Sequence, residues 1–314
     1  MSKPIVYIDG KEGTTGLQIY DRLAGREDIE LLLIDEDKRK DPAERKKLMN
    51  AADLVFLCLP DAAAVEAAAL VENPGTRIID ASTAHRTAPG WVYGFPELGR
   101  DQRESIRTAR RVANPGCYAT GFISLIAPLV KTGLLSPDAP LTCHAISGYT
   151  GGGKKAIAQY EAADREPELV SPRHYAVTLS HKHIPEMVQV CGLKRKPIFM
   201  PMICDFPQGM VVTVPLYLEA LAGGQTLDSL RTAYRDFYAG ARFVTVRPDD
   251  APACGFIGAN NLAGTNDLQI FVCGNGEQVM LSARLDNLGK GASGAAVQNM
   301  NLMLGLPEET GLTE

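Results

Sequence analysis

The chain has 314 residues, 45% of them hydrophobic and 22% charged, a composition typical of a globular protein with one or two large cores. Its net charge of -5 disfavours binding to nucleic acids or to membrane surfaces, which are themselves negatively charged. We expect no transmembrane helix, because no run of about 18 uncharged apolar residues is present, and the N-terminus lacks a signal-peptide pattern. These features predict a cytoplasmic protein.

The first third of the chain predicts alternating strands and helices. Apolar, strand-like runs cover residues 5–8, 29–37, 52–60 and 76–82, and helix-like runs cover 17–23 and 61–71. The run at 52–60 is almost wholly apolar, as in a strand buried on both faces. This order of elements predicts an α/β fold with a Rossmann-type, doubly wound parallel sheet.

The rest of the chain is richer in strands. Alternating runs with Gly-Asn or Pro-Gln-Gly turns are found at residues 140–153, 174–186, 199–220, 241–246 and 267–287. Helix-like runs cover 117–130, 227–240 and 290–306. We predict an α+β domain with a mostly antiparallel sheet over residues 117–289, and a dinucleotide-binding domain formed by residues 1–116 together with 290–314.

A glycine-rich loop joins the first predicted strand to the first helix. Gly10, Gly13 and Gly16 recur at three-residue spacing, a GxxGxxG pattern rather than the usual GxGxxG. Glycines let the backbone approach a pyrophosphate, and the first helical turn, with Thr14 and Thr15, directs N–H groups toward its charge. This position between strand and helix favours a dinucleotide site over a purely structural turn.

The residues that would select between NAD and NADP are consistent with either cofactor. Asp35 follows Gly16 by 19 residues, where an acidic side chain usually binds the ribose hydroxyls of NAD. Lys38 and Arg39, followed by Lys40, are suited to the 2′-phosphate of NADP, although such a run is also typical of a solvated helix start. The residues alone leave both cofactors open.

Cys117 follows Asn114-Pro115-Gly116 and opens a helix-like run. The first turn of a helix stabilises a thiolate through its unpaired N–H groups and the helix dipole. Beside a nicotinamide cofactor, such a thiolate would attack an acyl carbon, and hydride would reduce the resulting thioester to an aldehyde. From the local sequence alone, a buried packing cysteine is an equally good interpretation. Six cysteines are expected to be small packing residues, because the chain has no CxxC pair: Cys58, Cys143, Cys191, Cys204, Cys254 and Cys273.

His181 and His183 lie in the sequence SHKHIPE. Their spacing of two in a predicted strand places both side chains on one face. Metal binding is disfavoured because no third ligand is evident and Lys182 adds positive charge, so we predict no metal site. General acid-base catalysis fits better, with Glu186 orienting one ring, while core packing remains the simpler alternative.

Two further loops are suited to anions. Ser82 and Arg86 lie at and just after the C-terminal end of the fourth predicted strand, at the edge where open α/β sheets bind ligands. Ser147 and Gly148 begin a second glycine-rich loop that ends with two lysines. Together with the dinucleotide loop, they suggest a phosphorylated substrate or product.

These motifs resemble those of the short-form N-acetyl-γ-glutamyl-phosphate reductases, a family in the aspartate-semialdehyde dehydrogenase superfamily. The resemblance extends over nearly the whole chain. Its motifs are GKEGTTG, DASTAHR, YGFPEL, ANPGCYAT, SGYTGGGKK, HKHIPE and DNLGKGASGAAVQNMN.

The resemblance implies NADPH-dependent reduction of N-acetyl-γ-glutamyl phosphate to the semialdehyde, with release of phosphate, in arginine biosynthesis. It identifies Cys117 as the nucleophile and His183 as the acid-base group. Substrate binding is implied for Ser82, Arg86, Asn114, His181 and Glu186. Cofactor binding is implied for Gly10, Gly13, Thr14, Thr15, Gly16, Lys38, Arg39, Ser147, Gly148, Lys290 and Gly291. We expect NADP as cofactor, no nucleic-acid or membrane partner, and a homodimer or homotetramer.

Three alternatives remain. The first is a related aspartate- or aminoadipyl-type semialdehyde dehydrogenase, whose substrate pocket would differ outside the motifs. The second is a nucleotide-sensing regulator without catalysis, which the presence of Cys117, His183 and Arg86 disfavours. The third is a cysteine hydrolase, which leaves the glycine loop unexplained.

Overall fold

The computed structural model describes residues 2–248 and 255–313, so Cys254 lies outside the described part. The chain divides into two compact units, and each is described by itself. Unit 1 consists of Met1–Pro96, Arg100–Pro115 and Ala292–Leu312, and unit 2 of Glu97–Gly99, Gly116–Gly291 and Thr313–Glu314. Within the described residues, no helix has the length and apolar character needed to span a bilayer.

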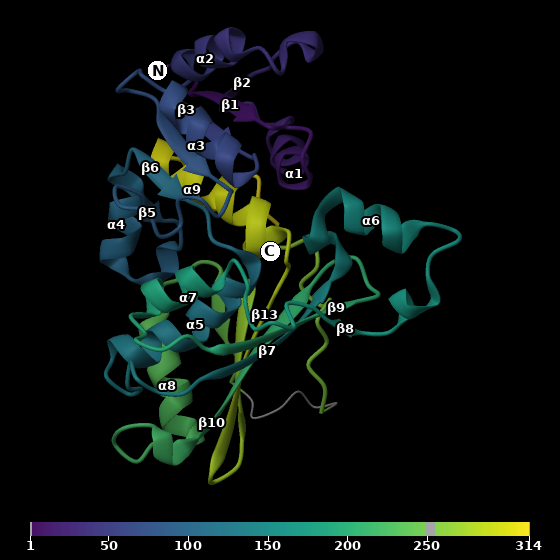
Figure 1. Cartoon of the computed structure of the whole chain (residues 1–314). Helices are drawn as coiled ribbons and strands as arrows, with labels where there is room; N and C mark the ends of the chain where they lie inside the picture. Colours follow the sequence, from purple (N-terminus) through teal and green to yellow (C-terminus); the bar gives the residue numbers. More distant parts are fainter. Residues whose placement is uncertain (1, 249–254, 314) are drawn as a thin grey trace. The chain divides into compact units, whose positions relative to one another are not determined.

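Unit 1 is built on a parallel sheet of six strands in the order β2-β1-β3-β4-β6-β5 (Figure 1). The strands are β1 (Ile5–Asp9), β2 (Glu30–Leu32), β3 (Leu54–Leu57), β4 (Arg77–Asp80), β5 (Val92–Tyr93) and β6 (Arg111–Ala113). The helices are α1 (Thr14–Leu23), α2 (Pro42–Ala51), α3 (Asp61–Leu70), α4 (Arg100–Thr108) and α9 (Gly294–Leu304). The predicted doubly wound parallel sheet is confirmed, whereas α2, α4, β5 and β6 have no counterpart among the predicted elements.

Alternation along β1 divides the core of unit 1 into two layers. Val6 and Ile8 pack with residues of α1, α4 and α9, whereas Tyr7 packs with residues of α2 and α3 on the opposite face. All four residues of β3 are buried. The apolar run at 52–60 therefore forms the strand covered on both faces that its composition predicted.

Unit 2 contains a mixed sheet of seven strands in the order β11-β12-β13-β10-β7-β9-β8. The strands are β7 (Thr142–Gly148), β8 (Arg173–His174), β9 (Ile198–Cys204), β10 (Met210–Tyr217), β11 (Val244–Val246), β12 (Leu268–Gly274) and β13 (Gln278–Leu285). The pairs β7–β9 and β11–β12 are parallel and the other four are antiparallel, which confirms the mostly antiparallel sheet.

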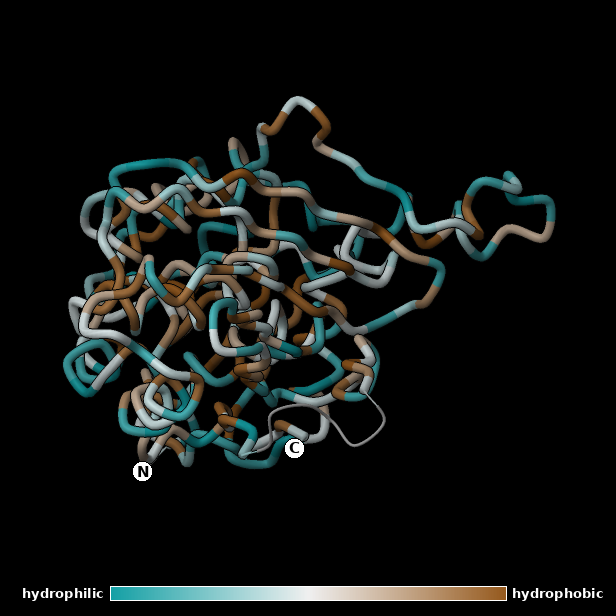
Figure 2. The backbone as a smooth tube through the Cα atoms, turned by 90° about the horizontal axis from the view of Figure 1, so that it is seen from below, coloured by the Kyte–Doolittle hydropathy of each residue, from teal (hydrophilic) through white to brown (hydrophobic). Residues whose placement is uncertain are grey.

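Helices cover one face of this sheet (Figure 1). They are α5 (Cys117–Lys131), α7 (Ile184–Cys191) and α8 (Leu227–Phe237), while α6 (Gly153–Glu161) follows β7. Figure 2 shows hydrophobic stretches along several extended segments and hydrophilic stretches in many turns. Burial alternates along β7, and His144 and Ile146 are half-buried on the face opposite α5. The nucleophile candidate thus stands at the start of the helix that packs directly on the sheet.

A proline inside α5 is compensated by α8. Pro128 has no N–H to donate to the Ser124 carbonyl one turn earlier. The hydroxyl of Tyr238, which caps α8, donates to that carbonyl at 2.8 Å, and the Tyr234 hydroxyl donates to the Leu125 carbonyl at 2.5 Å. Both tyrosines are buried. The two helices are therefore joined at the irregularity that the proline creates.

We expect Tyr238→Phe to lower the free energy of unfolding by about 1–3 kcal/mol, because it leaves a buried acceptor without its donor. In a Pro128→Ala background the helix regains its own donor to Ser124, so the same substitution should cost less. Urea denaturation of the wild type, both single variants and the double variant measures this coupling. An equal cost in both backgrounds contradicts the compensation.

Candidate active site

Cys117 is the first residue of α5, and its surroundings in unit 2 suit a thiolate. Gly116 is the N-cap, with extended backbone angles of φ -80° and ψ 148°, and as a glycine it has no side chain to cap the helix. The N–H groups of the first turn are therefore directed toward the residues at this end. Cys117 is partly exposed, whereas Cys143 and Cys191 are buried in unit 2. Burial raises the pKa of both these thiols, so they remain protonated.

The predicted strand across His181 and His183 is wrong. Only Arg173 and His174 form a strand, and the chain then passes through turns to α7, for which His183 is the N-cap. Pro185 stands in the first turn of this helix, where its fixed φ is favourable and its missing N–H costs nothing. The two histidines therefore meet through a turn. His181 Nδ1 accepts the His183 backbone N–H at 3.1 Å, and the ring centroids are 4.7 Å apart.

Tyr118 brings the starts of α5 and α7 together. Its ring lies 5.9 Å from the ring of His183 and 5.7 Å from that of His181, between centroids. Phe199 of β9 packs against the same ring at 5.3 Å. Burial raises the pKa of Tyr118 well above its ordinary value, so the hydroxyl stays protonated. Because Tyr118 follows Cys117 directly, the helix start that holds the predicted nucleophile adjoins the predicted acid-base group His183 through the Tyr118 ring.

Glu186 connects the same two helix starts through the backbone. Its carboxylate is 1% exposed and accepts the N–H of Gly116 at 3.1 Å. The structure thus places Glu186 against the cap of the nucleophile helix, a contact that the sequence did not predict. Gly291 approaches Cys117 from another segment, because a Cβ on Gly291 would lie 2.7 Å from the Cys117 Cβ. Both contacts restrict where the Cys117 side chain can stand.

Two other predicted cofactor residues end strand β7. Ser147 is buried, and its Oγ donates to the Gly148 carbonyl at 3.2 Å. A Cβ on Gly148 would lie 2.4 Å from the Pro207 carbonyl oxygen, so this glycine is required by close backbone packing. Lys290 is also in unit 2, where its ammonium forms a buried ion pair with Glu97.

The anion loop of unit 1 is organised around Asp80, the fully buried last residue of β4. Its carboxylate accepts the Ser82 hydroxyl at 2.7 Å and contacts His85 Nδ1 at 2.6 Å. Arg86 Nε donates to the Asn114 carbonyl at 2.9 Å, which ties the loop to the residue after β6. The predicted substrate residues Ser82, Arg86 and Asn114 thus come together at the carboxyl ends of neighbouring parallel strands.

The first glycine loop has the geometry of a dinucleotide-binding turn. Gly10 has φ +83°, and a Cβ there would lie 2.4 Å from the Cys58 carbonyl oxygen. A Cβ on Gly16 would lie 2.4 Å from the Gly10 carbonyl oxygen, so Gly16 allows α1 to pack closely on the turn. Gly13 is the N-cap of α1 and has no side chain to cap the N–H groups that follow at Thr14 and Thr15. These N–H groups suit a pyrophosphate.

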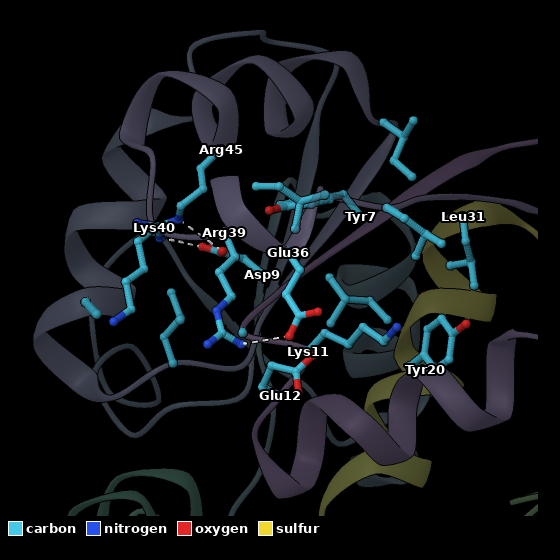
Figure 3. A pocket seen from close by; sticks show the side chains of 17 residues that line it. Tyr7, Asp9, Lys11, Glu12, Tyr20, Leu31, Glu36, Arg39, Lys40 and Arg45 are labelled. Atoms are coloured by element: carbon cyan, nitrogen blue, oxygen red, sulfur yellow. Dashed lines mark hydrogen bonds and ion pairs between the residues drawn. The ribbon is translucent and has the colours of Figure 1, made fainter.

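A cavity of about 610 Å³ adjoins this loop, large enough for part of a dinucleotide (Figure 3). Apolar side chains of β2, including Leu31, line it together with Tyr7 and Tyr20. Its polar residues are Asp9, Lys11, Glu12, Glu36, Arg39, Lys40 and Arg45. Arg45 binds the Asp9 carboxylate through two nitrogens, at 3.1 and 2.6 Å. The composition and the capping geometry both fit a dinucleotide.

The basic run divides into two parts. Lys38 pairs with Asp35 at 2.7 Å in an exposed ion pair, and neither residue lines the cavity. The hydrogen bond between them lowers the pKa of Asp35 and raises the pKa of Lys38, so both side chains stay charged. Arg39 and Lys40 line the cavity, with Arg39 3.9 Å from Glu36 (Figure 3).

Sequence reasoning missed Arg45, which α2 brings to the cavity from a charged stretch with no motif. In the described ranges, no group of three acidic, histidine or cysteine side chains is placed to hold a metal ion.

Known proteins match both units. A family model described as "Semialdehyde dehydrogenase, NAD binding domain" matches residues 6–106, and one described as "Semialdehyde dehydrogenase, dimerisation domain" matches residues 117–287. An N-acetyl-gamma-glutamyl-phosphate reductase from Rhizobium meliloti is 54% identical over 308 residues, 96% of this chain and 99% of the relative. The chain belongs to the N-acetyl-gamma-glutamyl-phosphate reductase family. A second relative, N-acetyl-gamma-glutamyl-phosphate reductase 2 from Nostoc sp., is 49% identical and covers 99% of this chain and 100% of its own.

Solved structures agree with the family's fold. An aspartate semialdehyde dehydrogenase II from Vibrio cholerae matches with a TM-score of 0.73 at 14% identity, over 97% of this chain and 99% of that one. At this identity the likeness concerns the fold alone. The resemblance of the motifs to the reductase family is thus confirmed, and the first matched domain is one that binds a nicotinamide dinucleotide.

Proposed function

We propose that the chain reduces N-acetyl-γ-glutamyl phosphate to N-acetylglutamate 5-semialdehyde with release of phosphate, a step of arginine biosynthesis. The observation that carries the proposal is that the helix starts of Cys117 and His183 meet at the Tyr118 ring, in a chain that shares about half of its residues with relatives named for this reaction. A thiolate and an acid-base group are what acyl transfer from a phosphate requires.

Cys117 is the nucleophile. Its thiolate attacks the γ-acyl carbon, the carbon–oxygen bond to phosphate breaks, and a thioester to Sγ remains. The N–H groups at the start of α5 stabilise the negative charge that develops on the acyl oxygen. The nicotinamide cofactor, when bound, supplies hydride for the reduction. His183 donates a proton to the same oxygen during reduction and takes it back as the resulting hemithioacetal collapses, so that the carbon–sulfur bond breaks, the aldehyde leaves and the thiolate is regenerated.

The remaining predicted substrate residues take supporting roles in this proposal. Arg86 binds the phosphoryl oxygens by charge-assisted hydrogen bonds, with Ser82 and Asn114 beside it on the same strand ends. His181 stands beside His183 and orients the bound substrate. Glu186 supports the centre by holding the cap of α5, in accord with its bond to Gly116.

We assign NADP as the cofactor. The first turn of α1 binds the pyrophosphate, and the cavity lined by Tyr7 and Leu31 accommodates the adenosine. Arg39 and Lys40 stand at this cavity and suit the 2′-phosphate, whereas Asp35 is paired with Lys38 and does not line it. Ser147, Gly148 and Gly291 remain proposed contributors on the nicotinamide side, and Lys290 contributes through the backbone of its turn, since its ammonium is buried against Glu97.

We propose that the dinucleotide-binding domain consists of residues 1–116 and 290–314 and the catalytic domain of residues 117–289, in keeping with the two family models. The compact units differ from this division at its boundaries, where Gly116, Lys290 and Gly291 belong to unit 2. A homodimer or homotetramer forms through the second domain. Its sheet carries exposed apolar side chains outside the helix-covered face, including Tyr217 (59% exposed) and Met280 (40%). A second copy would remove these from water.

The reverse reaction tests substrate and cofactor together. We expect N-acetylglutamate semialdehyde, phosphate and NADP to yield NADPH, measured by its absorbance, with NAD and aspartate semialdehyde far poorer. Activity confined to aspartate semialdehyde, or independent of phosphate, contradicts the proposed substrate.

The same assay shows which of the basic residues 38–40 bind the 2′-phosphate of NADP. Arg39→Ala with Lys40→Ala should raise the KM for NADP by about tenfold or more, because each charge-assisted hydrogen bond contributes about 1.5–3 kcal/mol, and leave the KM for NAD little changed. Lys38→Ala is the matched control, since its ammonium already pairs with Asp35. A larger effect of Lys38→Ala than of the other pair assigns the 2′-phosphate to Lys38 instead.

A further inference from the structure

A fully buried ion pair joins Lys290 to Glu97 in unit 2. Nζ and Oε1 are 2.6 Å apart, and each side chain is 1% exposed. The ammonium lies 5.7 Å from the centroid of the Phe243 ring. Removing both charges from water costs solvation free energy that their attraction often fails to recover. Because the pair itself contributes little to stability, we infer its role from the two segments that it joins.

The pair joins two segments that stand at crossings of the chain between the units. Glu97 belongs to a three-residue segment, Glu97–Gly99, that clusters with unit 2 although both flanking segments belong to unit 1. This segment is also held by Lys131 of α5, whose Nζ donates to the Leu98 carbonyl at 3.0 Å. Lys290 immediately precedes Gly291, the last residue of unit 2 before the chain returns to unit 1. Through the ion pair, Glu97 thus connects the segment around Lys290 to the segment that Lys131 of α5 holds.

The segment around Lys290 is a turn of π-helix, residues Gly289–Ser293. The Gly291 N–H donates to the Asp286 carbonyl at 2.9 Å. A Cβ on Gly289 would lie 2.0 Å from the Thr265 carbonyl oxygen, so this backbone is closely packed. On the far side of Lys290, Gly291 lies against Cys117, with no room for a Cβ. Any displacement of the turn therefore changes the contact with Cys117. Single π-turns inside helices are frequent at functional sites.

We propose that the Glu97–Lys290 ion pair positions Cys117 by holding Gly291 against it. Lys290 is then a positioning residue that acts through the backbone of the turn. This inference rests on the proposed function in taking Cys117 as the nucleophile. Without the pair, the turn relaxes, and Cys117 no longer keeps its place over the N–H groups that begin α5. Its thiolate then loses part of the stabilisation that the helix start provides.

The test measures the reactivity of Cys117 without substrate. Alkylation by iodoacetamide is followed by peptide mass spectrometry across pH 6–10 in the wild type, Lys290→Met, Glu97→Gln and the double variant. We expect each variant to alkylate Cys117 about threefold or more slowly at neutral pH, with the midpoint of the profile displaced upward. We also expect kcat to fall about tenfold with KM within about twofold, and Lys290→Arg to restore part of both.

Arg231→Met is the matched control, because Arg231 is another buried cation of unit 2, ion-paired with Asp228 at 2.6 Å. It should lose stability and keep the wild-type alkylation profile. If a single variant fails to fold, the double variant, which leaves no unpaired buried charge, decides. A wild-type profile in the folded variants, or the same change in Arg231→Met, overturns the proposal. Reductase activity in a Cys117→Ser variant would instead refute the proposed function, independently of this measurement.

Discussion

Cys117→Ser is expected to lower kcat by about 10⁴-fold or more while the protein remains folded. Serine matches the size of cysteine, so the contacts of the site with Gly291 and Tyr118 should persist. A neutral hydroxyl at a helix start is a far weaker nucleophile than a thiolate there, because it stays protonated at neutral pH. The steady-state rate of aldehyde formation from N-acetyl-γ-glutamyl phosphate measures the loss, and circular dichroism confirms the fold.

The covalent intermediate provides an independent measurement. In the absence of a nicotinamide cofactor, the acyl phosphate should acylate Cys117 in the wild type, which intact-protein mass spectrometry detects as an added N-acetylglutamyl group. Cys191→Ala is the control, since Cys191 is a buried packing residue at the end of α7, with its thiol held protonated by burial. That variant should acylate normally. Acylation of another cysteine in the Cys117→Ser variant would show that Cys117 is not the nucleophile.

The parts of the fold that could be predicted are those with strong local periodicity. The strands of unit 1 are continuous apolar runs, because helices cover both faces of the sheet, and such runs are visible in the sequence. Helix α4 escaped prediction because it is almost entirely polar, with Ile106 as its buried residue. Its helical state depends on packing against α9, which follows far later in the chain.

The error at His181 and His183 has a similar cause. Alternation of polar and apolar residues over 174–186 matches the period of a strand, but Pro185 is equally suited to the first turn of a helix. The helix prevails because Ile184 and Met187 are buried at helical spacing, where they pack α7 against α5. A period of two over so short a run could not decide between the two structures.

The position of Cys117 was predictable because it depends on neighbours in the sequence. Pro115-Gly116 breaks the chain, and the helix-like run after it begins at Cys117, as it does in the structure. The contacts that restrain this thiol join residues distant in sequence: Gly116 and Glu186 are 70 positions apart, and Glu97 and Lys290 are 193. Nothing local in the sequence indicated these partners, so the contacts of Glu186 with Gly116 and of Lys290 with Glu97 were not predicted.

His183→Asn is expected to lower kcat by about 10²–10⁴-fold, the usual contribution of a positioned acid-base group. His183 is 5% exposed and packs against Tyr118, so asparagine keeps a polar group there but supplies no titratable proton. The role proposed for His183 is proton donation as the thioester is reduced. Acylation of Cys117 and the first release of phosphate should therefore persist in this variant, while aldehyde formation slows.

The pH profile separates this role from a structural one. In the wild type, activity should decline at alkaline pH as the histidine loses the proton that it donates, and this decline should be absent from His183→Asn. His174→Asn is the control, since His174 is an exposed histidine of the same unit, on the edge strand β8. Rapid phosphate release followed by slow aldehyde formation assigns His183 to the reductive step. Loss of both together would place His183 in thiolate formation, because an unacylated Cys117 releases no phosphate.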